Sequence, residues 1–509
     1  MLMNKNLLKR FLVIVPAALL QLVWFYVLWV WLNPWAVQIS VVLAAVSFLL
    51  VLFIITKRDE SSYRTLWLLV ILLFPVPGTV LYLVFGNKRT TRPLQRRFKG
   101  APALPAVPAE EAAPVWDALK ADDLRVAQTF GYVHAITGAS PQFCEGAFYY
   151  PLGDDMFPAM LAAMERARAY IFVEYFIVTP GEMWDAVSEV MLRKAAQGVD
   201  VRVIYDDMGS LSTFSFEDAQ RLRAQGVKCV PFNPFVFIKG TLNYRDHRKM
   251  LVVDGEVAFS GGVNLADEYI NRFERFGHWK DTGFKLVGAP ARSYARMFAE
   301  FWNAFAREPV PEELLRLGPC ASPGSPDNGF VLSYYDSPLR PQAASNELYI
   351  ELLSLATGYA WFFTPYLLPG DALLDALTRA ARRGVDVRII MPGVPDKKVV
   401  FRMAHGFYPA LLEAGVKIYE YTPGFVHAKS VLVDDVLGTI GTVNLDYRSL
   451  FLHFENNALF YRAGLLTDLK EDFLATQAQY RAMRLGENVR EGFGSWLVNG
   501  VLRVFSPLC

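Results

Sequence analysis

Apolar runs of helical length dominate the beginning of the chain. Residues 11–32 form one run, after three basic residues, and residues 35–56 form a second, before Lys57 and Arg58. Each has about the 20 apolar residues that a bilayer crossing takes. Because basic residues flank spans on the cytoplasmic side, we expect two transmembrane helices with the N-terminus in the cytoplasm. A cleavable signal peptide is disfavoured, since the first run is too long and the second follows at once.

A third apolar segment, residues 66–85, is interrupted by Phe-Pro-Val-Pro-Gly at residues 74–78. Proline breaks a helix because it lacks the backbone N–H and clashes with the preceding turn. Basic residues on both flanks favour a re-entrant or interfacial hairpin, and a kinked third span is the alternative. The basic cluster between Lys88 and Lys99 is either an anchor for anionic headgroups or ordinary topology-setting charge.

From residue 138 onward, short apolar strands alternate with helical patterns, and the pattern occurs twice. GVDVRVI at 198–204 returns as GVDVRII at 384–390, and GVK at 226–228 returns at 415–417. Each half predicts strands that alternate with helices and end in a hairpin. We expect an α/β fold with two α/β sandwich domains from an internal duplication, each with a largely parallel sheet.

Shifts in composition divide the chain further. Stretches rich in Ala, Pro and Gly are typical of linkers. The expected organisation is a membrane region at 1–99, a linker at 100–137, an α/β domain at 138–308, a linker at 309–328, a second α/β domain at 329–483 and an amphipathic tail at 484–509.

The hairpin that closes each half carries a repeated polar motif. Residues 247–264 are HRKMLVVDGEVAFSGGVN, and residues 427–444 are HAKSVLVDDVLGTIGTVN. Both run His-x-Lys, four residues, Asp, six residues, Gly, a small residue, a spacer and Asn. Only six histidines occur in the chain, and two of them begin these copies. Two copies in matched surroundings indicate function rather than chance.

The spacing within one copy predicts what each residue does. Side chains alternate along a strand, so His247 and Lys249 share a face and Asp254 has the opposite parity. We therefore expect Asp254 to brace the turn through backbone N–H groups rather than to touch substrate. The glycines at 261–262 allow close approach, and Asn264 brings an amide to the strand end. This set suits a phosphodiester: Lys and Asn bind the non-bridging oxygens, while His attacks phosphorus or moves a proton.

The second copy supplies an equivalent set, with Thr442 where the first has Gly262. The candidate catalytic residues are His247, Lys249, Asp254, His427, Lys429 and Asp434, and the candidate phosphate-binding residues are Asn264 and Asn444. Other polar residues are expected to be structural. These are the adjacent Asp206 and Asp207, as a cap or turn, and His134, His278, His405 and His453, which lack ligand spacing.

Composition narrows the class of protein. The net charge is +1, so no overall basic character indicates a nucleic-acid partner. Hydrophobic residues make up 53% of the chain and aromatic residues 14%, which fits a membrane-attached enzyme. The four cysteines lack CxxC or zinc spacing and fit a reducing, cytoplasm-facing location. No P-loop, GxGxxG, HExxH or GxSxG pattern supports a competing chemistry.

The doubled motif resembles the phospholipase D superfamily, in which two such motifs meet at one active site. GTVNLDYRSLFLHFEN in the second half, the FSPL ending and the N-terminal LYLVFGNKR resemble bacterial cardiolipin synthases of that superfamily, with one span more than is usual there. The resemblance implies a two-step displacement without a metal or other cofactor. One His forms a phosphohistidine, and the other protonates the leaving alcohol and deprotonates the incoming one. Superfamily precedent favours His247 as the nucleophile.

A working His also needs an orienting carboxylate on its other ring nitrogen. In the superfamily an acidic residue about 25 to 35 positions after the His has this role. Asp281 and Glu455 fall in that range after His247 and His427, and Glu274 is the rival to Asp281.

Three functions remain open at this point. The first is a cardiolipin synthase that moves a phosphatidyl group from one phosphatidylglycerol to another and releases glycerol. The second is a membrane phospholipase D with water as the acceptor, and the third is an inert lipid-binding scaffold. The expected partners are phosphatidylglycerol and membrane lipids, without nucleic acid. The expected location is the bacterial inner membrane, multi-pass, with the catalytic domains on the cytoplasmic side.

Two segments have further alternatives. The first half carries an insertion at 231–240 with three Phe and an Ile, which either dips into the headgroup region or folds onto the protein. Residues 493–505 predict a helix that is either interfacial or docked on the second domain.

Overall fold

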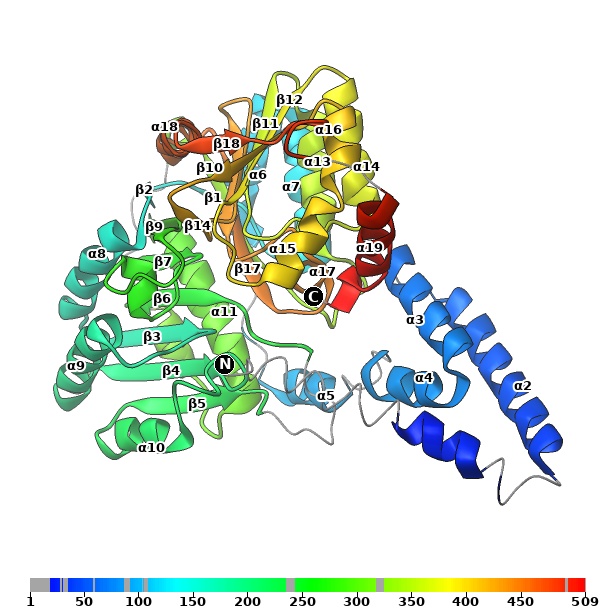
Figure 1. Cartoon of the computed structure of the whole chain (residues 1–509). Helices are drawn as coiled ribbons and strands as arrows, with labels where there is room; N and C mark the ends of the chain where they lie inside the picture. Colours follow the sequence, from blue (N-terminus) through cyan, green and yellow to red (C-terminus); the bar gives the residue numbers. More distant parts are fainter. Residues whose placement is uncertain are drawn as a thin grey trace. The chain divides into compact units, whose positions relative to one another are not determined.

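The computed structural model in Figure 1 describes residues 19–27, 30, 35–57, 60–86, 92–102, 104, 109–234, 243–316, 325–489 and 493–508. The chain divides into an N-terminal unit that ends at Arg92 and a catalytic unit that begins at Pro93. Most of the apolar run 11–32 and most of the insertion 231–240 lie outside the described residues.

The N-terminal unit is helical. After residue 35 it contains α2 (Ala36–Ile55), α3 (Ser61–Leu73), α4 (Pro75–Leu81) and the π-helix η2 (Tyr82–Gly86). Helix α3 begins where the Glu60 carboxylate accepts hydrogen bonds from the backbone N–H groups of Ser62 and Tyr63. It ends before Pro75, which starts a new helix because proline is best accommodated in a first helical turn, where its missing N–H has no partner to lose. The predicted interruption of the segment 66–85 is confirmed.

Large apolar side chains of α2 are exposed in this unit, among them Val41, Phe48 and Leu49. No helix among the described residues has both the length and the apolar content that a membrane crossing requires.

The catalytic unit contains two large β-sheets, one for each half of the duplication. The first-half sheet has the order β2-β9-β7-β6-β3-β4-β5. Its strands are β2 (Gly146–Tyr150), β3 (Tyr170–Tyr175), β4 (Asp200–Asp206), β5 (Lys228–Phe232), β6 (Lys249–Val253), β7 (Val257–Gly261) and β9 (Gly283–Val287).

The second-half sheet has the order β1-β10-β17-β16-β15-β11-β12-β13-β18. Its strands are β1 (Gln142–Phe143), β10 (Phe330–Asp336), β11 (Tyr359–Phe363), β12 (Asp386–Pro392), β13 (Lys417–Tyr421), β15 (Ser430–Val433), β16 (Leu437–Gly441), β17 (Glu455–Tyr461) and β18 (Tyr480–Ala482). The series β9-β7-β6-β3-β4-β5 corresponds strand for strand to β17-β16-β15-β11-β12-β13, as the duplication predicts.

The sheets are mixed, so the expectation of largely parallel sheets is wrong. Only β3, β4 and β5 run parallel in the first half, and only β11, β12 and β13 in the second. The remaining strand pairs of the two sheets are antiparallel. The reason is connectivity: helical crossovers join the parallel strands, whereas the motif hairpins β6–β7 and β15–β16 add antiparallel neighbours.

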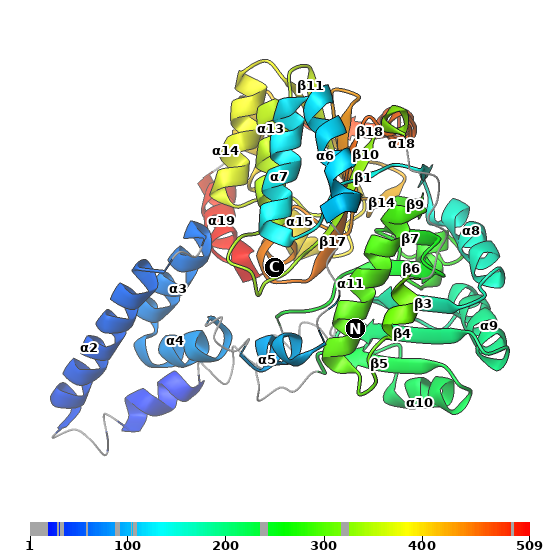
Figure 2. The ribbon, with the colours of Figure 1, turned by 180° about the vertical axis from the view of Figure 1, so that it is seen from behind.

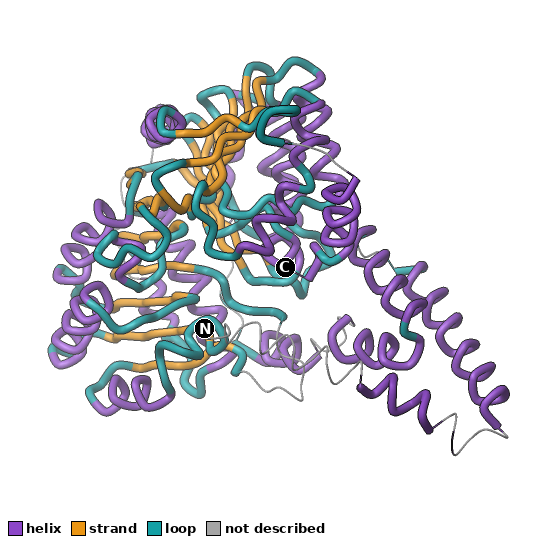
Figure 3. The backbone as a smooth tube through the Cα atoms, viewed as in Figure 1, coloured by secondary structure: helices purple, strands orange, loops and turns teal. Residues whose placement is uncertain are grey.

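Helices pack against both sheets (Figure 3). Those with residues from the first half are α8 (Gly153–Glu165), α9 (Glu182–Ala196), α10 (Phe216–Ala224), η5 (Asp267–Ile270) and α11 (Ala289–Phe305). Those of the second half are α13 (Ala344–Leu355), α14 (Asp371–Arg382), α15 (Lys398–His405), α16 (Tyr408–Glu413), α17 (Tyr447–Phe451) and α18 (Leu465–Gln477). Three further short elements are α5 (Arg92–Gly100), α12 (Glu312–Arg316) and η6 (Pro326–Asn328).

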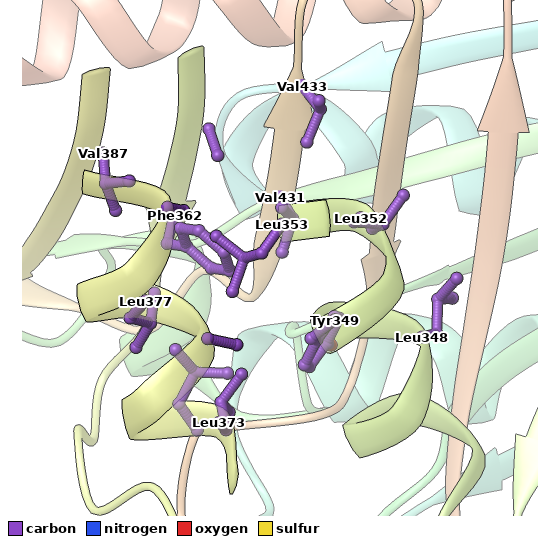
Figure 4. Packing of buried hydrophobic residues seen from close by; sticks show 14 of the residues in the cluster. Leu348, Tyr349, Leu352, Leu353, Phe362, Leu373, Leu377, Val387, Val431 and Val433 are labelled. Carbon is purple, nitrogen blue, oxygen red and sulfur yellow. The ribbon is translucent and has the colours of Figure 1, made fainter. Parts of the chain in front are cut away.

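The assignment of residues 100–137 as a linker is wrong from residue 109 on. These residues form α6 (Ala109–Asp122) and α7 (Leu124–Thr137), and α7 packs against α13 of the second half (Figure 2). Leu119 and Phe130 are fully buried in the same core as Leu348. That core lies between α13, α14 and the second-half sheet, where Leu352, Leu377 and Val431 converge (Figure 4). A stretch that looks like a spacer by composition therefore covers an apolar surface.

The predicted C-terminal helix is present as α19 (Phe493–Val504), followed by η7 (Ser506–Leu508). It packs against α15, and the Arg503 guanidinium lies 4.9 Å from the centre of the Phe407 ring. The docked alternative therefore describes this face of α19, while Val498 and Val501 are exposed.

Candidate active site

The two motif histidines enter the site through backbone pairing between the halves. Before His247, Asp246 forms a parallel bridge with Phe454, and the His247 N–H donates to the Phe454 carbonyl at 2.8 Å. Before His427, β14 (Gly424–Val426) pairs in parallel with β8 (His278–Lys280), and the His427 N–H donates to the Lys280 carbonyl at 2.6 Å. Each motif thus begins beside the segment that leads to the other half's acidic residue.

This pairing decides which carboxylate meets which imidazole. His247 Nδ1 lies 2.9 Å from both carboxylate oxygens of Glu455, and His427 Nδ1 lies 2.7 Å from Asp281 Oδ2. Both carboxylates are fully buried. The residues named from the sequence do contact the histidines, but the pairing within each half that the spacing indicated is wrong, because the partner comes from the other half. The rival Glu274 is exposed.

Both motif lysines are buried beside their histidines. The Lys249 ammonium donates to the His247 carbonyl at 2.6 Å, and that of Lys429 donates to the His427 carbonyl. This contact fixes each ammonium beside an imidazole, as the shared strand face predicts.

The motif aspartates brace turns. Asp254 accepts hydrogen bonds from the backbone N–H groups of residues 168, 169 and 170 at 2.7–2.9 Å. Asp434 accepts in the same way from residues 357, 358 and 359 at 2.7–2.9 Å. Both have positive φ, 53° and 48°. These are the contacts expected from the strand parity, and they tie the end of each motif strand to the start of β3 or β11.

The motif asparagines lie at the ends of the returning strands, where they were expected. Asn264 accepts from the Ile177 N–H at 3.1 Å and donates to the Tyr269 hydroxyl at 2.7 Å. Asn444 donates to the Ser449 hydroxyl at 3.1 Å. Each amide is therefore held in place by a neighbouring hydroxyl.

The small position before each asparagine differs between the halves. Thr442 donates its hydroxyl to Glu455 Oε2 at 2.5 Å. At Gly262, an added Cβ would lie 2.0 Å from Asp281 Oδ1. Glycine is therefore required in the first half by the carboxylate behind it, whereas the second half uses the same space for a hydroxyl donor.

Asp206, at the end of β4, binds the two residues that precede His247. It is fully buried, and both of its oxygens lie 3.0 Å from Arg245 Nε. It also accepts from the backbone N–H groups of Asp246, Met208 and Gly209. The prediction of a turn or cap in place of a metal ligand agrees with these contacts.

Burial and charge set the protonation of the site. Burial, reinforced by Lys249, lowers the pKa of His247 well below 6.5, and the neighbouring His427 and Lys429 contribute in the same direction. Burial lowers the pKa of His427 to about 4, with Lys429 acting in the same direction and Asp281 opposing it. These mutual effects mean that both motifs act within one electrostatic site.

Burial also shifts the pKa values of the two motif lysines and of Glu455. Burial lowers the pKa of Lys249 to about 8 and that of Lys429 to about 7. Burial raises the pKa of Glu455 well above 4.5, with Lys249 opposing. The free site therefore favours neutral imidazoles and holds two ammonium groups that lose their charge near or above neutral pH.

His453, which was expected to be structural, lies beside His247 and Glu455. Its ring centre lies 5.7 Å from that of His247, and its ligand atom lies within 4.8 Å of those of His247 and Glu455. The three residue types are ones that bind zinc. However, Arg448 Nε donates to His453 Nε2 at 3.3 Å, so the neutral ring carries its proton on Nδ1 and offers Glu455 an N–H, which does not fit a metal ligand. The signal available in the sequence was position: His453 stands two residues before Glu455.

The comparisons with known proteins agree with this geometry. The family model described as "Cardiolipin synthase, PLD-like domain" matches residues 160–277 and 349–476, and a model described as "Phospholipase_D-nuclease N-terminal" matches residues 45–87. A cardiolipin synthase of Halalkalibacterium halodurans is 32% identical over 94% of this chain and 95% of its own length. One of Geobacillus thermodenitrificans is 34% identical over 92% of this chain and 93% of its own length.

Two further proteins are similar to this chain. An uncharacterised protein of Streptococcus mutans is 39% identical over 90% of this chain and 99% of its own length. The crystal structure of a phosphatidylserine synthase from Haemophilus influenzae superposes with a TM-score of 0.56 at 17% identity, covering 75% of this chain and 98% of that structure, and thus shares the fold. With paired motifs in one site and relatives that align over nearly their whole length, the chain belongs to the cardiolipin synthase family of the phospholipase D superfamily.

Proposed function

We propose that this protein is a cardiolipin synthase that transfers the phosphatidyl group of one phosphatidylglycerol to a second, giving cardiolipin and glycerol. The similarity to cardiolipin synthases over almost the whole chain supports a phosphatidyltransferase. No nucleotide is required, because one phosphodiester replaces another.

The site supports a two-step route. In the first step Nε2 of His247 attacks phosphorus, an N–P bond forms, the P–O bond to glycerol breaks, and His427 gives the leaving oxygen a proton. In the second step a hydroxyl of the acceptor phosphatidylglycerol gives its proton to His427 and attacks phosphorus, and the N–P bond breaks. His427 must enter the first step protonated, and the phosphate anion of the bound substrate favours that form because it offsets the neighbouring ammonium charges.

The other motif residues have supporting roles in this proposal. Lys249, Lys429, Asn264 and Asn444 bind the non-bridging oxygens, whose charge increases in the transition state. Glu455 and Asp281 orient the two imidazoles from the far ring nitrogen. Asp254 and Asp434 act through the backbone turns they hold. The single observation that carries the proposal is that each motif histidine rests on the other half's buried carboxylate.

We further propose that the N-terminal unit attaches the enzyme to the inner membrane, with the catalytic halves on the cytoplasmic side. The exposed apolar side chains of α2 and the basic residues that follow the apolar segments support this arrangement. Alkaline carbonate extraction of membranes tests attachment, and protease accessibility of tags at each end tests a multi-pass topology against an interfacial one. Release of the protein by carbonate would contradict a spanning arrangement.

The reaction is tested with purified protein and phosphatidylglycerol alone. Cardiolipin together with an equal amount of glycerol is the expected result. Phosphatidic acid as the main product would identify a phospholipase D, since water would then be the acceptor in place of a lipid hydroxyl. Binding of lipid vesicles without turnover would identify a scaffold.

A further inference from the structure

A third imidazole stands beside the two that the motifs provide. The His453 side chain is 11% exposed, and its Nδ1 lies 3.8 Å from Glu455 Oε1, the carboxylate that holds His247. Phe454, between them in sequence, is fully buried and pairs with the backbone on both sides of Asp246. His453 is thus fixed at the rim of the site by the same backbone pairing that places His247.

The proton position of His453 follows from its neighbours. Arg448 Nε donates to His453 Nε2 at 3.3 Å, so Nε2 is the acceptor and Nδ1 carries the hydrogen. Burial and the cationic Arg448, Arg245, Lys249 and Lys397 lower the pKa of His453 well below 6.5, which keeps the ring neutral. Among the described residues, Nδ1 has no hydrogen-bond partner. A buried N–H therefore faces Glu455 without a partner at hydrogen-bond distance.

Glu455 has a demanding role in the proposed reaction. When phosphorus binds Nε2 of His247, that ring becomes cationic and its Nδ1–H needs an ionised carboxylate. Burial opposes ionisation of Glu455 by raising its pKa, Asp446 adds to this effect, and Lys249, Thr442 and Ser449 oppose it. A buried carboxylate is held in its charged form by the N–H and O–H groups that donate to it.

We propose that His453 is a positioning residue, whose Nδ1–H donates to Glu455 when substrate binds and so holds the carboxylate ionised against His247 during attack on phosphorus. This inference rests on the proposed phosphotransfer at His247. His453 keeps its own proton throughout: the N–P bond forms at His247, and the leaving oxygen takes its proton from His427. Shortening a 3.8 Å separation to a hydrogen bond on substrate binding is common in active sites, where catalytic contacts tighten in the complex.

Beside His427, the matching position among the described residues holds an indole in place of an imidazole. The residue that stands two positions before Asp281 is Trp279, whose ring centre lies 5.5 Å from that of His427. Its indole N–H has no hydrogen-bond partner among the described residues. The extra imidazole thus belongs to one motif only, the one with the candidate nucleophile.

Three substitutions separate the roles of the two ring nitrogens. His453→Asn places an amide near the Nδ1 position, His453→Gln places one near Nε2, and His453→Phe keeps a ring without a donor. The readout is the pH profile of kcat/KM with phosphatidylglycerol. We expect His453→Phe and His453→Gln to lose about tenfold at neutral pH and to shift the acidic limb upward by about one pH unit, while His453→Asn stays within about threefold of wild type. If the Phe variant does not fold, the comparison of the Asn variant with the Gln variant still tests the proposal.

His134→Asn is the control, because His134 Nδ1 contacts the Ala139 carbonyl at the end of α7, away from the motif residues. Equal activity losses in the Asn and Gln variants with an unmoved acidic limb would overturn the proposal, as would wild-type profiles in all variants. Phosphatidic acid as the wild-type product would refute the synthase but would leave the acidic-limb comparison intact, since hydrolysis uses the same attack by His247.

Discussion

The two halves of the catalytic unit share one strand order and one motif but surround their histidines differently. His247 lies against Phe176 and His453, and its carboxylate, Glu455, receives a hydroxyl from Thr442. The imidazole of His427 lies among the rings of Tyr269, Trp279 and Phe425, and behind its carboxylate stands Gly262. The duplicated frame is symmetric, whereas the polar contacts are richer around His247.

The difference fits a division of labour. A nucleophile that becomes cationic benefits from a carboxylate with several donors, whereas an acid–base that alternates between two charge states benefits from apolar walls that keep water away. The crossed carboxylates join the two environments, since each half completes the site of the other. We therefore expect neither half to be active alone.

The largest expected effect is loss of either histidine. His247→Ala and His427→Ala should each reduce cardiolipin formation by roughly 10⁴-fold, and the double variant should be no worse than either, because the two residues act as one unit. Initial rates with phosphatidylglycerol measure this effect. Unchanged turnover in one variant would mean that the reaction does not pass through both imidazoles.

The carboxylates come next and test the crossed arrangement. Glu455→Gln should slow formation of the phosphohistidine at His247, and Asp281→Asn should slow proton transfer at His427, each by roughly 10²- to 10⁴-fold. Rapid quenching separates the steps. If the quenched intermediate carried its phosphorus on His427, His427 would be the nucleophile in place of His247.

The small position before each asparagine should give an intermediate effect. Gly262→Ala places a methyl group 2.0 Å from Asp281 Oδ1, so the carboxylate must move and release His427. A loss of roughly 10- to 100-fold in kcat is expected for such a displacement. The matched variant Thr442→Ser keeps the hydroxyl that donates to Glu455 and should stay close to wild type. Equal activities for the two variants would contradict the different roles assigned to positions 262 and 442.

The smallest change at neutral pH concerns the lysines. The pKa of Lys429 is about 7 and that of Lys249 about 8, so both ammonium groups lose their protons as the pH rises. Since charged ammonium binds phosphate, kcat/KM should fall about tenfold per pH unit above the lower value. Lys429→Arg stays charged and should move this limb upward toward that of Lys249. An alkaline limb that does not move would assign the titration to another group.

Much of this protein follows from its sequence alone. The duplication, the paired motifs and the bracing role of Asp254 and Asp434 come from spacing, because parity along a strand is a local property that tertiary structure does not alter. The helix break before Pro75 is local in the same sense, since proline acts on its own turn.

Only the tertiary structure decided which groups meet across the halves. Spacing named Asp281 and Glu455 but paired each with the wrong histidine, because sequence distance does not record that each motif runs beside the other half's strand. The same reason hid His453 beside His247 and placed α6 and α7 in the second half's core. Contacts between distant segments depend on how two buried surfaces close on each other, and no local pattern encodes that.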